Sequence, residues 1–97
     1  MHFFVAICSM ELGLHGVDSL KAKRGIVRRV ITRTQDRFRI AMSEVGALDS
    51  LGSAELGIAI VGNDKRVVNS VVDRVVGFVE DLYLADVRSF EFTIEAY

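Results

Sequence analysis

The chain has 97 residues, of which 51% are hydrophobic and 26% charged, and its formal net charge is −1. This length allows one compact domain over residues 1–97, and this composition excludes an intrinsically disordered chain. The longest apolar run, residues 3–8, is much shorter than the roughly 20 residues of a membrane helix, and no positive cluster precedes it as in a signal peptide. We therefore expect a cytoplasmic protein without a membrane partner.

Residues 4–14 place apolar side chains at every second position, which predicts a first strand with one buried face. Cys8 lies on that apolar face, and as the only cysteine it cannot form an internal disulfide. We expect a buried, unreactive thiol at this position.

A long helix is predicted after the first strand. Asp18 or Ser19 can accept a hydrogen bond from its first free amides, and the helix should end near Phe38. Its apolar positions recur at about 100° per residue. The residues that share this face are Leu20, Val27, Val30, Ile31, Thr34 and Phe38.

A second strand is expected to begin at Ile40, and two strands and a helix are expected after it. Residues 54–61 alternate as a third strand, and a valine-rich stripe at helical spacing predicts a second helix over residues 63–82. Residues 89–95 alternate again as a fourth strand. The order βαββαβ, with one apolar face on each element, predicts an α+β sandwich of ferredoxin-like fold, in which two helices pack on one face of a four-stranded antiparallel sheet.

Charge is distributed unevenly along the chain. Residues 19–39 hold eight basic residues and one acid, Asp36, for a net charge of +7, whereas the remainder has a net charge of −8. On the second helix, three basic residues are offset by four acids. The first helix therefore has an excess of positive charge that ordinary solvation does not require.

This excess predicts an anion-binding surface on the outer side of the first helix. Like charges four residues apart, such as Arg29 and Arg33, repel each other unless a partner offsets them. One interpretation is a phosphate-bearing partner, a ribosome or a structured RNA, which arginine contacts bidentately; the other is pairing with acids elsewhere in the chain. The candidate binding residues are Lys21, Arg24, Arg28, Arg29, Arg33 and Arg37.

The opposite side of the sheet is not expected to bind RNA. The third strand lacks the aromatic residues that stack bases in RNA-recognition motifs. That sheet face should instead display Glu11, Glu55, Glu91 and Glu95. Binding through the helix should therefore read phosphates, with little sequence specificity for RNA and none for DNA. Alternatively, the basic helix of one copy could face the acidic sheet of another, giving a homo-oligomeric interaction module.

An enzyme that binds a small anion is the third hypothesis. His15 and Lys21 flank a glycine-containing turn before the first helix, but no arginine lies between Gly13 and Ser19 to hold an anion. We interpret His15 as a solvated loop residue. No spacing of ligands indicates a metal, and no motif indicates a cofactor or a catalytic residue.

Three features stay open at this stage. Glu44 continues the inward period of the second strand, and we interpret it as a strand-end carboxylate bonded to backbone or water. Gly25 lies on the polar side of the first helix. There it could let the backbone of a partner approach closely, or it could have no specific role. The role of the loop over residues 46–53 is not predicted.

Several short motifs, in order, resemble a known family. They are Ser19-Leu20-Lys21-Ala22-Lys23-Arg24, Arg37-Phe38, Ser43-Glu44-Val45, Ala54-Glu55-Leu56-Gly57 and Asn63-Asp64. Together they resemble the YlxP-like family of small bacterial proteins of unknown function, across nearly the whole chain. The resemblance implies a ferredoxin-like fold and, because genes of this family often neighbour genes of translation initiation and ribosome maturation, a ribosome-related role. It supplies no catalytic residue.

Overall fold

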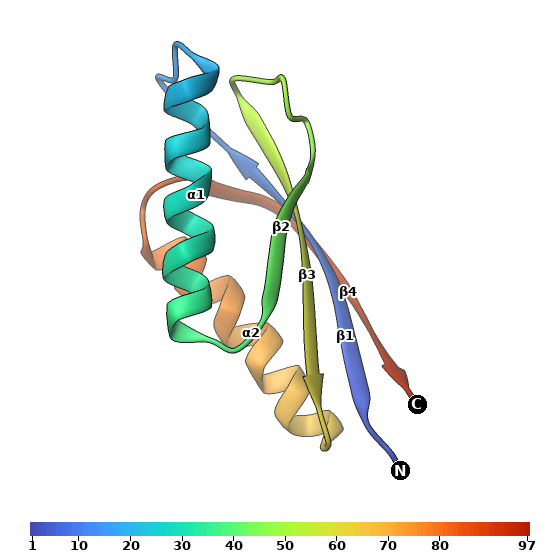
Figure 1. Ribbon diagram of the computed structural model, residues 1–97. Coiled ribbons are helices and arrows are strands. Elements are labelled where there is room, and N and C mark those ends of the chain that lie inside the picture. Colours follow the sequence, from blue (N-terminus) through green and yellow to red (C-terminus); the bar gives the residue numbers. More distant parts are fainter.

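A computed structural model describes all residues from Met1 to Tyr97 (Figure 1). Six elements follow one another in the predicted order βαββαβ. They are β1 (Phe4–Gly13), α1 (Leu20–Arg37), β2 (Ala41–Gly46), β3 (Ser53–Gly62), α2 (Lys65–Asp81) and β4 (Asp86–Ala96). The fourth strand begins three residues before the expected position, because its pairing with β1 extends to Asp86.

The four strands form one antiparallel sheet in the order β2-β3-β1-β4. Both helices lie on the same side of this sheet, and the chain termini lie together at one end of it (Figure 1). This is the ferredoxin-like α+β fold that the sequence predicts. The order leaves β2 and β4 as edge strands, with β2 beside α1.

Both helices begin where a polar side chain satisfies a free amide. Ser19 Oγ accepts a hydrogen bond from the Ala22 amide at 3.1 Å, and Asp64 Oδ1 accepts one from the Arg66 amide at 2.9 Å. These contacts confirm the predicted starts, because an N-cap residue is the one whose side chain replaces the missing helical partner.

The core lies between the helices and the sheet. Seventeen buried apolar residues form it, and all but Leu14 and Phe38 belong to the two helices or to strands β1, β2 and β3. Cys8 belongs to this core, as expected, and burial raises the pKa of its thiol to about 11. A thiol with that pKa holds little of the reactive thiolate near neutral pH.

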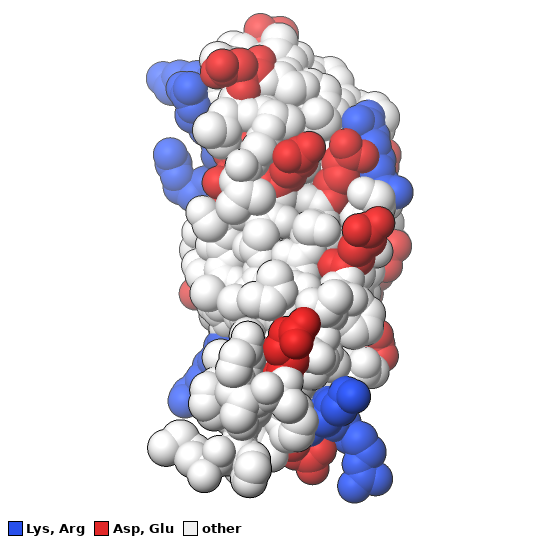
Figure 2. Space-filling model, turned by 90° about the vertical axis from the view of Figure 1, so that its right-hand side faces the viewer, with Lys and Arg blue, Asp and Glu red and all other residues white.

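The other side of the sheet is open to solvent and acidic. Strand pairing places Glu11 opposite Glu55, and it places Glu91 opposite Ser9 on the same face. Figure 2 shows this side of the molecule, with acidic side chains spread over it and basic side chains at its margins. The predicted acidic face is therefore confirmed.

Candidate functional site

The basic surface of α1 consists of the six predicted residues, and all of them are exposed: Lys21, Arg24, Arg28, Arg29, Arg33 and Arg37. The chain forms two ion pairs, His15 with Asp86 and Lys23 with Glu44, and neither includes a residue of this surface. Pairing with acids elsewhere in the chain, the alternative interpretation, is seen for one cation of the basic segment, Lys23, which lies outside these six residues. The repulsion between neighbouring arginines on α1 has no intramolecular compensation.

The basic surface divides into two rows along α1. Arg24 and Arg28 stand on the side toward β2, where they line a cleft of about 220 Å³ together with Glu44. At 100° per residue, Arg29 and Arg33 lie on the opposite flank of the helix. A partner that follows the helix can therefore contact two parallel rows of guanidinium groups.

Arg37 is the last residue of the row that begins with Arg29 and Arg33, and it lies beside an aromatic ring. Its guanidinium carbon lies 5.5 Å from the centre of the Phe38 ring, and that of Arg74 from α2 lies 5.8 Å from the same centre. Phe38 also meets Phe78 edge to face, at 5.6 Å between ring centres. These contacts hold the end of α1 against α2 and orient two cations at the seam.

Lys23 does not belong to the basic surface, although it lies within the basic segment. Its side chain is fully buried, with 0% exposure. Lys23 Nζ donates a hydrogen bond to the carbonyl of Ala47 and lies 3.1 Å from Glu44 Oε2. The expected apolar face of α1 is thus incomplete, because it also contains this lysine.

Glu44 points toward the helices because β2 stays regular up to this residue. The strand register shifts only between Glu44 and Gly46, so Glu44 keeps the inward phase of Met42. The expected bond from the Glu44 carboxylate to the backbone is absent, and the carboxylate pairs with Lys23 instead. Neither of its oxygens accepts a hydrogen bond from within the chain, and buried Oε2 has only the charge of Lys23 nearby.

A signal for this pair was present in the sequence. Lys23 follows Ser19 and precedes Val27 by four residues each, which places it in the apolar row of α1. Glu44 occupies an inward position of β2 by the same kind of count. Each charge alone looks like a local exception, whereas the two together neutralise one another.

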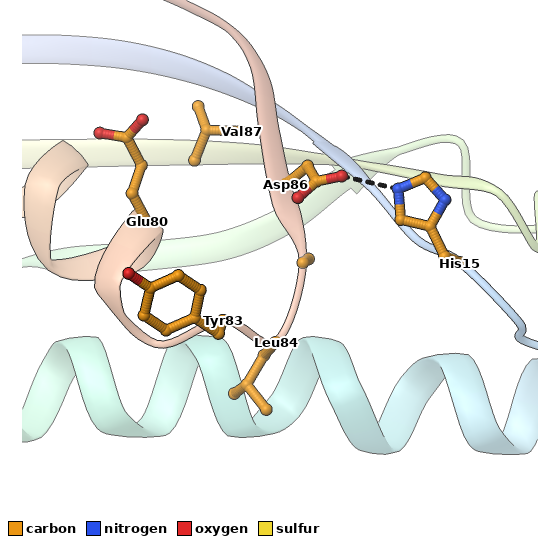
Figure 3. Close-up of a pocket in the computed structure, with 7 residues that line it drawn as sticks. His15, Glu80, Tyr83, Leu84, Asp86 and Val87 are labelled. Carbon is orange, nitrogen blue, oxygen red and sulfur yellow. Dashed lines mark hydrogen bonds and ion pairs between the residues drawn. The ribbon is translucent and has the colours of Figure 1, made fainter.

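A second hollow lies at the start of β4 (Figure 3). Its volume is about 490 Å³, and its walls are His15, Glu80, Tyr83 and residues 84–87. His15 Nε2 lies 2.6 Å from Asp86 Oδ2, and Figure 3 shows these two side chains pointing toward one another. Glu80 and Tyr83 stand apart from the pair in the same view.

His15 is exposed, as predicted, but it is paired rather than merely solvated. The side chains of His15 and Asp86 are 72% and 70% exposed, so water competes for both partners. The chain brings together no group of three ligands that could hold a metal ion. A solvent-exposed pair without a nucleophile or a buried acid does not define a reaction.

The remaining open features have modest structural roles. A side chain added at Gly25 would meet no atom within 4 Å, so no contact inside the chain requires glycine there. In the loop over residues 46–53, Ser50 Oγ accepts hydrogen bonds from the amides of Gly52 and Ser53.

No helix of the chain is long and apolar enough to span a bilayer.

Comparisons with known proteins agree with the fold and leave the activity open. Among curated proteins, the "Uncharacterized protein YlxP" of Bacillus subtilis (strain 168) is 29% identical over 76 residues, which cover 78% of this chain and 83% of that protein. Among solved structures, the de novo designed protein Foldit4 has a TM-score of 0.52 at 13% identity and covers 98% of this chain and 96% of its own. A designed protein with a ferredoxin fold has a TM-score of 0.49 at 16% identity, covering 96% and 83%.

The match to the Bacillus subtilis protein agrees with the YlxP-like resemblance that the sequence motifs indicate. The likeness to Foldit4 concerns the fold alone, because 13% identity transfers no site. A family model described as "Protein of unknown function (DUF503)" matches residues 5–92. The chain therefore belongs to the DUF503 family, whose members have no assigned function.

Proposed function

We propose that this protein is a cytosolic accessory factor that associates with the ribosome or with structured RNA, and that α1 is the element that binds phosphates. The single observation behind this proposal is the exposed basic surface of α1, whose six cations form no ion pair within the chain. Closely spaced arginines that repel one another are stabilised by a polyanion, because each phosphate relieves that repulsion.

The distribution of charge over the molecule supports binding through one side only. The open sheet face presents Glu55, Glu91 and Glu95, which would repel a phosphate backbone. The helix side presents the two arginine rows instead. An RNA strand or duplex approaching from solvent would therefore be oriented toward α1 before contact.

The test is salt-dependent co-sedimentation with ribosomal particles, together with binding to a structured RNA. The decisive variant is the charge reversal Arg28→Glu, Arg29→Glu and Arg33→Glu. Its matched control reverses three exposed cations away from α1, Lys65→Glu and Arg66→Glu on α2 and Arg88→Glu on β4, so that both variants change the net charge by the same amount.

We expect the wild type to bind with a log–log salt slope of roughly −0.7 to −0.9 for each phosphate contact. The α1 reversal should abolish binding, and the control reversal should retain most of it. Equal binding by the wild type and a folded α1 variant would exclude α1 as the phosphate-binding element. Equal loss in both variants would indicate that net charge alone governs the association.

A homo-oligomeric interaction module is the second candidate. The observation in its favour is that one molecule presents a basic helix on one side and an acidic sheet on the other (Figures 1 and 2). Two copies could join by placing the helix of one on the sheet of the next. This arrangement would use the same arginines without any nucleic acid.

A further inference from the structure

The two edge strands of the sheet differ in length and regularity. Strand β2 has 6 residues and ends in a register shift between Glu44 and Gly46. Strand β4 has 11 residues, and its one register shift leaves Arg88 unpaired near its start. Bulges, proline and lysine are among the means by which proteins prevent further strands from pairing with an edge. From Ser89 onward β4 has none of these, so its outer edge can accept another strand.

The pairing of β4 with β1 determines which backbone groups point outward. Phe3 and Tyr97 exchange both amide-to-carbonyl hydrogen bonds, at 3.1 and 2.9 Å. In an antiparallel ladder such pairs alternate with pairs that exchange none, so every second residue of β4 directs its N–H and C=O away from β1. These outward residues are Phe90, Phe92 and Ile94, and no loop of the chain bonds to their backbone groups.

The same three residues form an apolar row on the helix side of β4. Their partners on β1 are buried residues, namely Met10, Cys8 and Ala6. Phe90 and Ile94 pack against the core, whereas Phe92, in the middle of the row, is 41% exposed. The Phe92 ring lies 6.0 Å from the Phe90 ring, centre to centre, so the apolar surface continues from the core to the outer edge of the sheet.

We propose that β4 pairs antiparallel with β4 of a second copy of this chain, about a two-fold axis at Phe92. Phe92 then lies opposite Phe92 of the second copy, and Phe90 lies opposite Ile94. The outward residues exchange hydrogen bonds with one another, and the apolar row runs without interruption from one core to the other. A two-fold contact between identical edges closes on itself, so the expected species is a dimer.

Charges on the open sheet face favour this register. A two-fold axis at Glu91 would put that carboxylate opposite its own copy, and an axis at Thr93 would put Glu91 opposite Glu95; like charges directly opposite are destabilising. An axis at Phe92 instead places Glu91 opposite Thr93 and Glu95 opposite Ser89. No acid then faces an acid directly.

The two remaining registers that pair outward residues with each other are less complete. An axis at Phe90 brings the unpaired Arg88 opposite Phe92, where the ladder is irregular. An axis at Ile94 leaves Phe90 beyond the end of the partner strand. The axis at Phe92 is therefore the one that uses the whole apolar row.

The β4–β4 contact also has its own dependence on salt. The Glu91 carboxylates of the two copies lie diagonally across it, on the exposed face, and repel each other weakly. Salt screens that repulsion and should tighten the dimer. Association of a basic helix with an acidic sheet weakens with salt instead. None of the α1 cations takes part in the β4–β4 contact, so it is independent of the proposed function.

The experiment is sedimentation equilibrium of the full chain over a series of protein concentrations, at low and at high salt. The key variant is Phe92→Lys, which brings two ammonium groups together at the two-fold axis and removes the aromatic contact. Its matched control is Val45→Lys, which adds the same charge at a 62% exposed residue of the other edge strand. A second pair, Thr93→Lys and Thr93→Glu, changes only an exposed residue.

We expect the wild type and Val45→Lys to form dimers that tighten with salt, and Phe92→Lys to raise the dissociation constant about a hundredfold. Thr93→Lys, opposite Glu91 of the second copy, should lower that constant about fivefold, and Thr93→Glu should raise it by a similar factor. If Phe92→Lys is poorly folded, the Thr93 pair decides, because equal dissociation constants for lysine and glutamate there would overturn the proposal.

Several other results would also overturn the β4–β4 contact. They are a wild type that stays monomeric at every concentration, a dimer that survives Phe92→Lys, a dimer that is lost in Val45→Lys, and a dimer that weakens with salt. The variant carrying Arg28→Glu, Arg29→Glu and Arg33→Glu separates this contact from the proposed function. It should lose RNA binding and keep the dimer. Unchanged RNA binding with an intact dimer would overturn the role of α1 alone, whereas loss of the dimer would overturn the β4–β4 contact.

Discussion

At the scale of single residues, the least expected feature is a charged pair enclosed between α1 and β2. Lys23 is fully buried, and its ammonium group is held by the Ala47 carbonyl and the carboxylate of Glu44. Such a pair does not by itself add stability, because desolvating two charges offsets most of their attraction. Removing one partner, however, leaves the other charge buried without compensation, which destabilises the folded state.

We therefore predict that Lys23→Met destabilises the protein by about 3 kcal/mol, because it leaves Glu44 without a counter-charge. The double variant Lys23→Met, Glu44→Met should recover much of that loss. The measurement is urea unfolding of the wild type, both single variants and the double variant. Additive effects around this cycle would show that the two residues are not energetically coupled.

Cys8 allows a prediction of pH dependence. Burial raises the pKa of its thiol from 9.0 to about 11, so the folded state holds the proton more tightly than the unfolded state. Its contribution to stability is complete below pH 9 and is lost as the pH rises from 9 to 11.

The advantage of the wild type over Cys8→Ala in free energy of unfolding should shrink by about 2 to 3 kcal/mol across that range. Comparing the two proteins cancels the titration of lysines and tyrosines, which they share. A constant difference from pH 8 to pH 11 would contradict the burial of this thiol.

At the scale of elements, α1 carries like charges one turn apart, which lowers the stability of the helix. Arg33 has Arg29 one turn before it and Arg37 one turn after it, and none of the three pairs with an acid. Replacing the central charge converts two repulsive pairs into attractive ones.

We predict that Arg33→Glu stabilises the free protein by about 0.5 kcal/mol while weakening any association with RNA. The opposite direction of the two effects is the informative result, because a purely structural arginine would lose stability on reversal. Thermal unfolding at low salt gives the first quantity, and the RNA-binding assay gives the second. Arg33→Gln, which removes the charge without reversing it, should lie between.

At the scale of the whole molecule, the two candidate functions differ in what they require of the acidic face. Phosphate binding leaves that face free, whereas head-to-tail association covers it with the helix of another copy. Sedimentation velocity of the wild type, compared with the variant carrying Arg28→Glu, Arg29→Glu and Arg33→Glu, distinguishes them.

Association through helix and sheet predicts that the wild type forms larger species at low salt and that the charge reversal returns it to a monomer. The RNA-associated role predicts the same sedimentation coefficient for both proteins without RNA. A shift that depends on salt but survives the charge reversal would contradict both expectations for α1.

The sequence by itself determined the order of elements, the helix starts to within a residue or two, the apolar faces and the cations of α1. These follow from periodicity and from local hydrogen bonding, both of which are properties of neighbouring residues. The tertiary structure decided that Lys23 and Glu44 meet, because their pairing depends on a contact between residues 21 positions apart in the chain. It also decided that the arginines of α1 remain unpaired, since whether a charge finds a partner depends on the distance in space between residues far apart in the chain.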